Sequence, residues 1–177
     1  MKYGIAGMLL CVAILITLTG CREEKNLAPI LERQGLVNDY ASVFTEEEST
    51  ALESDLKAYE KETCHQIVVL TVPTLAGESI SDFSTRTATA WDIGQPRIKN
   101  GILISIAMQE NGIRIEAASG LDFLVNEGIG QQILDTEMIP LFREGRITEG
   151  ITNGVAAIKE AARRRSYPDN HRPSICR

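Results

Sequence analysis

Four side chains with oxygen atoms are candidates to bind a divalent metal ion together: Asp39, Asn100, Asp122 and Asn126. Asn100 comes just before a predicted β-hairpin and Asp122 just after it, with Asn126 close by and Asp39 arriving from the N-terminal side. Carboxylate and amide oxygens suit a hard divalent ion, which could polarise a phosphoryl oxygen. The alternative is structural, since Asp122 and Asn126 could cap helices and Asn100 could form a turn.

The predicted hairpin is centred on Asn111-Gly112, a pair that easily supplies the positive φ angles of a tight turn. Residues 102–107 are almost wholly apolar, as in a strand covered on both faces, and residues 113–117 alternate apolar with polar. In an antiparallel hairpin the two outer ends lie side by side. This places Asn100-Gly101 next to residues 119–122, the end at which we expect any site.

The remaining patterns predict the elements that position this end. An apolar β-branched run over 67–72, stopped by Pro73, indicates a central strand. Helical spacing or capping patterns indicate four helices, which follow Thr45, Ser79, Asn126 and Arg146. Gly150 and Gly154 on the last helix would allow close approach of a neighbour. The order predicts an α/β fold, a small mixed sheet containing the hairpin with helices on its faces.

The first 20 residues indicate an export signal: a short basic start, an apolar run, and Leu18-Thr19-Gly20 before Cys21. This ending resembles the lipobox of bacterial lipoproteins, which implies that Cys21 is lipidated and holds the domain on the periplasmic side of a membrane. Arg22 after the cysteine leans toward the outer membrane rather than the inner. The alternative is an uncleaved anchor with an incidental cysteine.

We expect residues 21–35 to form a polar linker, 36–163 the folded domain and 164–177 a basic irregular tail. The arginines of the tail could touch anionic phospholipid, or the tail could simply be solvated. Nucleic acid is not an expected partner. After Cys11 leaves with the signal and Cys21 takes lipid, Cys64 and Cys176 remain, and they could form a disulfide in an oxidising compartment.

Several short segments, in this order and spacing, resemble the TPM domain family of thylakoid lumen phosphatase-like and bacterial envelope proteins. They are Val37-x-Asp39, residues 66–72, Trp91-x-Ile93-Gly94, residues 100–104, Gly120-Leu121-Asp122 and the run from Ile139 to Ile151. The resemblance covers roughly residues 36–163. It implies a three-layer α/β/α sandwich about a small central sheet. It also implies acid phosphatase activity, calcium or another divalent ion near acidic loops, and repair or quality control of membrane complexes.

The chain departs from the family pattern where the chemistry would lie. Lys99 stands where the family usually has Asp before Asn-Gly, Asp122 stands for Glu, and Asn126 stands where Asp is common. Each change removes or shortens an oxygen ligand, and a lysine repels a cation. The sequence also contains neither a G-x-S-x-G nucleophile motif nor a Walker loop.

We therefore expect a membrane-anchored, non-catalytic binding or quality-control factor for envelope membrane proteins. The alternative is a metal-assisted acid phosphatase built on Asp39, Asn100, Asp122 and Asn126.

Overall fold

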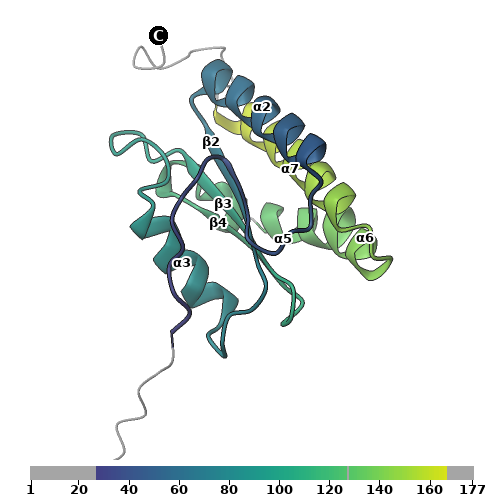
Figure 1. Cartoon of the computed structure of the whole chain (residues 1–177). Helices are drawn as coiled ribbons and strands as arrows, with labels where there is room; N and C mark the ends of the chain where they lie inside the picture. The colour runs from purple at the N-terminus through teal and green to yellow at the C-terminus, as the bar shows by residue number, and fades with distance from the viewer. Residues whose placement is uncertain (1–26, 127, 167–177) are drawn as a thin grey trace, which may run out of the picture.

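The computed structural model describes residues 27–126 and 128–166. Its centre is a four-stranded sheet in the order β1-β2-β3-β4 (Figure 1). The strands are β1 (Val37–Asp39), β2 (Gln66–Val72), β3 (Gly101–Ala107) and β4 (Gly112–Ala117). β1, β2 and β3 run parallel, and β4 returns antiparallel beside β3. This confirms the predicted mixed sheet with a hairpin.

Helices cover both faces of the sheet, which makes the three layers (Figure 1). α3 (Ile80–Ala90) packs on β3 and β4 from one side. α2 (Glu46–Thr63) packs on β1 and β2 from the other, side by side with α7 (Ile147–Ser166). The α/β class and the three-layer arrangement are therefore confirmed.

The two central strands are buried along nearly their whole length, as expected for a parallel pair covered by helices. β1 was not predicted. It is only three residues long and holds a single apolar residue, so its sequence carries no strand pattern of its own. It forms because its backbone adds to the edge of β2.

The hairpin is confirmed, but its turn is wider than a two-residue Asn-Gly turn. Ala107 pairs with Gly112, so residues 108–111 form the loop. Asn111 supplies the positive φ of 50°, and Gly112 is already the first residue of β4.

Local capping signals were accurate for α2 and α3 and wrong for Asn126. Thr45 caps α2 in a capping box with Glu48, and Ser79 caps α3. Asn126 instead ends the short helix α4 (Phe123–Asn126), and Gly128, with a φ of 72°, precedes α5 (Ile129–Ile133). The positive φ required there favours glycine over asparagine as the residue that turns the chain.

Helical structure continues from α5 through a π-helical turn (Leu134–Met138) into α6 (Ile139–Arg143). α7 packs closely against this segment. A Cβ at Gly150 would lie 2.7 Å from the Phe142 ring, and one at Gly154 would collide with the Met138 side chain. The predicted role of these glycines in close approach is confirmed. Because α7 extends to Ser166, residues 164–166 of the predicted irregular tail are helical, and residues 167–177 lie outside the described residues.

The predicted linker differs most from the structure, because residues 27–35 lie packed on the domain. Ala28 is buried, and the Trp91 indole Nε1 donates to the carbonyl of Leu31 at 2.8 Å. Gln34 and Gly35 donate their amides to the Asn38 side chain. The prediction of a polar linker overlooked the apolar run 27–31, in which Ala28 joins the hydrophobic core and Ile30 and Leu31 pack against it. No helix in the described part of the chain is long and apolar enough to cross a membrane.

Three glycine backbones pack tightly at the open end of the hairpin. A Cβ on Gly101 would collide with the carbonyl oxygen of Ile93, and one on Gly120 would collide with that of Ile98. Gly94 lies against Gly101 with a φ of 92°. Because the atoms that an added Cβ would meet belong to the backbone, no side-chain movement could make room for it.

We predict that Gly101→Ala lowers the free energy of unfolding by about 3 kcal/mol, because the added methyl must displace backbone. Gly112→Ala in the same hairpin is the matched control. Its Cβ would meet the Ile80 side chain at an ordinary 3.5 Å, so the change should be within about 0.5 kcal/mol. Urea unfolding of both variants measures this, and equal stabilities would contradict the close packing.

Candidate functional site

A cleft of about 420 Å³ opens at the end of the hairpin where the sequence placed a site. Its walls are the C-terminal half of α3, the loop 91–100, the first residues of β3 and the last of β4. The lining combines apolar side chains with the polar residues Thr85, Thr89, Gln95, Lys99 and Glu116.

Asn100 holds the loop that forms one wall. Its side chain is 3% exposed; Oδ1 accepts from the Gln95 amide at 2.7 Å, and Nδ2 donates to the Cys64 carbonyl at the end of α2. Gln66 adds a second clamp, accepting from the Gly94 amide at 3.0 Å. The carbonyl oxygen and the amino group of the Asn100 side chain are therefore both used to fix backbone, which is a structural role.

Charges in the cleft are mixed and separated. Glu116 pairs with Arg114 on the same strand at 3.0 Å. Lys99 is exposed at the rim with a φ of 47°, and no ion pair within residues 27–126 and 128–166 involves it. Asp92 is exposed in the same loop. The charges near the cleft are therefore the exposed Lys99 and Asp92 and the paired Glu116.

The four predicted metal ligands do not converge. Asp39 pairs with Thr71, whereas Gln66 pairs with Gly101 at the start of β3. The interval from Gln66 to Thr71 along β2 corresponds to about 16 Å, so Asp39 lies at the opposite end of the sheet from Asn100. The predicted site failed because the sequence did not reveal that residues 37–39 run parallel to β2.

Asp39 has its own structural task. Its carboxylate accepts from the amides of Val43 and Phe44, at 3.1 and 2.9 Å, and from the Thr71 hydroxyl. These bonds fix the loop that leads into α2.

Asp122 and Asn126 do lie together, in an exposed position with 3.4 Å between Asn126 Nδ2 and Asp122 Oδ2. Calcium requires six to eight oxygen ligands, and two side chains do not supply them. In the part of the chain that the structure describes, no cluster of three His, Cys, Asp or Glu residues could hold a metal. The residues present therefore do not fit a calcium site of the predicted composition.

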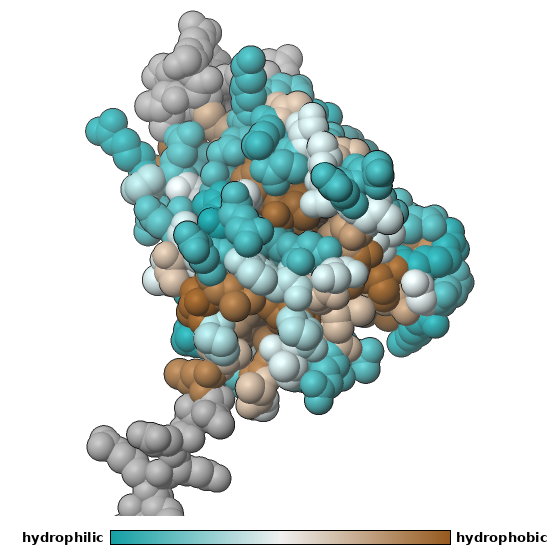
Figure 2. Space-filling view, viewed as in Figure 1, coloured by the Kyte–Doolittle hydropathy of each residue, from teal (hydrophilic) through white to brown (hydrophobic). Residues whose placement is uncertain are grey.

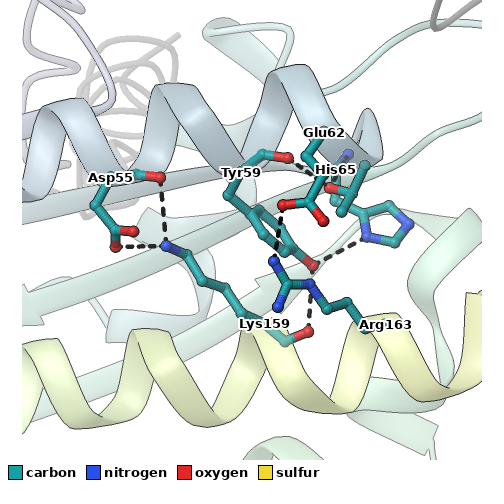
Figure 3. A network of polar contacts seen from close by, with 7 residues as sticks. Asp55, Tyr59, Glu62, His65, Lys159 and Arg163 are labelled. Carbon is teal, nitrogen blue, oxygen red and sulfur yellow. Dashed lines mark hydrogen bonds and ion pairs between the residues drawn. The ribbon is translucent and has the colours of Figure 1, made fainter.

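A polar network joins α2 and α7 (Figure 3), and the sequence did not predict it. Two cations from α7 approach the Tyr59 ring, with Lys159 Nζ 5.2 Å and the Arg163 guanidinium 5.4 Å from its centroid. Lys159 pairs with Asp55, and Arg163 with Glu62 at 2.9 Å. No local signal could have found it, because its members lie about a hundred residues apart in the chain.

His65 lies beneath this network, 2% exposed, with Nδ1 3.2 Å from the Tyr59 hydroxyl. Burial lowers the pKa of His65 to about 4, because the charged imidazolium would lose its hydration. His65 is therefore neutral at pH 7 and out of reach of a substrate. Its neighbour Cys64 is buried and disulfide-bonded, and since Cys176 lies outside the described residues, the pairing of these two cysteines stays a prediction.

A second cavity, of about 470 Å³, lies at the other end of the sheet. The hairpin loop and α6 form its walls, its lining is largely apolar, and Arg143 is a charged residue at its edge.

Comparison with known proteins agrees with this architecture. The model of the TPM domain family matches residues 37–161. The N-terminal domain of a Porphyromonas gingivalis protein, solved in solution, is 27% identical, with a TM-score of 0.66 over 72% of this chain and 81% of that one. The BA42 protein of Bizionia argentinensis is 20% identical, with a TM-score of 0.60 over 69% and 83% of the two chains. An N-terminal domain from Corynebacterium glutamicum has 13% identity and a TM-score of 0.56, over 76% and 83%. No curated protein matches the chain.

The buried His65 predicts a pH dependence of stability. Between about pH 6.5 and pH 4 the unfolded chain binds a proton at His65 that the folded chain does not, so the free energy of unfolding falls as the pH falls through this window. The loss attributable to His65 should reach about 3 kcal/mol at the acid end. Urea unfolding at several pH values should show a shallower dependence for His65→Gln. Tyr59→Phe, which keeps the buried imidazole, should retain the dependence, and identical profiles for wild type and His65→Gln would contradict the assignment.

Proposed function

The chain belongs to the TPM domain family, and from this premise we propose that it is a lipid-anchored factor of the bacterial envelope whose TPM domain binds membrane protein complexes without catalysing a reaction. Lipidation at Cys21 would place the domain on the periplasmic side, with the outer membrane favoured by Arg22. The observation that carries the non-catalytic part is the placement of Asp39 and Asn100 at opposite ends of the sheet.

The polar groups near the cleft support binding rather than metal chemistry. The side-chain oxygen and nitrogen of Asn100 are both hydrogen-bonded to backbone and the residue is buried, so this side chain is not presented to a ligand. Lys99 at the rim would oppose a divalent cation and attract a carboxylate. The metal-assisted phosphatase is accordingly the less favoured function.

The cleft itself has the character of a protein-binding site. It combines apolar walls with a few separated polar groups, so it suits side chains of a partner rather than a highly charged phosphate ester. Its position on fixed backbone, with Gly94, Gly101 and Asn100 packed together, keeps its shape without a ligand.

We predict that calcium or zinc at millimolar concentration does not raise the Tm of the domain beginning at Arg22. A ligand that binds only the folded state must raise the Tm, so this titration is sensitive to any site that folding creates. A clear increase that disappears in Asp122→Ala would overturn the non-catalytic proposal and justify a phosphatase assay.

We further predict that a photo-crosslinking amino acid at Thr89, in the cleft, captures envelope membrane proteins in intact cells. Thr152 is the matched control, since both are exposed helical threonines whose hydroxyl donates to the carbonyl four residues earlier. Crosslinks should form from position 89 and be absent from position 152. Absence of crosslinks from both positions, with the protein anchored at native levels, would contradict binding through the cleft.

A further inference from the structure

The N-terminal segment is clamped to the body by a buried ion pair. The Glu78 carboxylate, whose side chain is fully buried, accepts from the Ala28 amide at 3.0 Å and from Arg86 Nε and Nη2 at 2.8 and 2.6 Å. Arg86 also donates to the Ala28 carbonyl at 2.7 Å. Both backbone groups of Ala28 are thus held, so the chain is fixed to the domain from Ala28 onward.

This clamp lies at the end of the sheet opposite the cleft. Glu78 belongs to the loop 73–79, which leaves the carboxyl end of β2. The hairpin loop is joined to it, because Glu110 accepts from the Thr74 hydroxyl at 2.7 Å and from the Leu75 amide at 2.8 Å. The described chain begins beside the loop 73–79, to which Ala28 is bonded through Glu78, and the loop 91–100 lies at the far end of α3 (Figure 1).

The exposed surface at this end combines Leu27 and uncharged residues of the loop 73–79 with the exposed carboxylate of Glu110 in the hairpin loop. Leu27 is 47% exposed and is the exposed large hydrophobic residue among those described. Pro73, Ala76 and Gly77 in the neighbouring loop are also exposed. Figure 2 shows hydrophobic atoms gathered where the described chain begins. The second cavity, lined by Ala107 and Met108 among others, lies at the same end of the sheet.

Five residues, 22–26, separate Cys21 from Leu27, which makes six steps from Cα to Cα. Even fully extended they span about 20 Å, so an acyl chain on Cys21 would hold Leu27 within that distance of the bilayer surface. We propose that this end of the domain, formed by Leu27 and the loops 73–79 and 108–111, rests on the lipid interface with Leu27 inserted among the headgroups. The cleft then faces away from the bilayer. This inference rests on the proposed lipidation of Cys21.

The partner is lipid rather than a protein surface because the chain that runs from the lipidated Cys21 enters the domain at Leu27. A short tether gives the bilayer a high effective concentration at Leu27, so a weak apolar contact is enough to hold this end of the domain against the bilayer surface. The exposed residues of the loop 73–79 carry no charge, which suits contact with an interface without requiring anionic lipid.

The test uses the full lipidated chain in vesicles of phosphatidylethanolamine and phosphatidylglycerol that contain headgroup-nitroxide lipid. A fluorophore is attached at Ala76→Cys, in the loop 73–79, or at Arg97→Cys, an equally exposed loop position by the cleft. We expect the nitroxide to reduce the fluorescence at position 76 by about twofold and to leave position 97 nearly unchanged. Equal quenching at the two positions, or stronger quenching at position 97, would overturn the inference.

Two further variants sharpen the result. Insertion of about twenty Gly/Ser residues between Asn26 and Leu27 should abolish the quenching at position 76 while the chain still floats with the vesicles, since the tether no longer holds this end down. Leu27→Ser should weaken the quenching without release. A chain that fails to float overturns the lipid anchor and this inference with it. A chain that floats with position 76 unquenched overturns this inference alone.

Discussion

The parallel pairing of β2 with β3 is the constraint on which the rest of the structure depends. Both strands are buried on two faces, so the pair needs helices on each side and fixes the three layers. Its register also fixes which loops meet. The loops that follow β2 and β3 gather at one end, with the Glu110 contacts to Thr74 and Leu75, while the end of α2 meets Asn100 at the other. Each polar residue at a strand end is thereby assigned to one of two separated surfaces.

Features encoded by neighbouring residues could be predicted from the sequence. The capping box at Thr45, the cap at Ser79 and the hairpin around Asn111 depend on contacts within a few positions, and all three are present. The proposed metal site failed for the opposite reason. Whether Asp39 lies near Asn100 depends on the direction of β1 relative to β2, and a three-residue strand with one apolar side chain carries no signal of direction. The Tyr59 network likewise depends on the register between α2 and α7, which no local pattern records.

Residue type alone did not distinguish a ligand from a clamp. Asn100 and Asp39 have the oxygen atoms a hard cation prefers, yet both use them on backbone amides. A buried amide such as Asn100 must satisfy donor and acceptor groups together, and the carbonyl of Cys64 at the end of α2 needs a donor. An asparagine supplies both groups. An aspartate would place a carboxylate oxygen, which is an acceptor, against the carbonyl oxygen of Cys64. Asn100 therefore serves the fold, while Lys99 beside it is exposed at the rim of the cleft.

The two ends of the sheet differ in chemistry, so the domain presents a different kind of surface at each end. One end has a cleft with Lys99 at its rim, bounded by backbone that cannot yield. The other has Leu27, the exposed uncharged residues of the loop 73–79 and the exposed Glu110, with the Glu78–Arg86 pair fixing the segment that precedes β1. The Arg86 side chain is 33% exposed. Its hydrogen bond holds the pKa of Glu78 below its usual range, so the carboxylate stays charged and the clamp stays closed at neutral pH. A clamp that holds backbone at the point of entry transmits the position of the entering chain to the whole domain. A restraint that acts on the chain at Ala28 would therefore be transmitted to the orientation of the cleft.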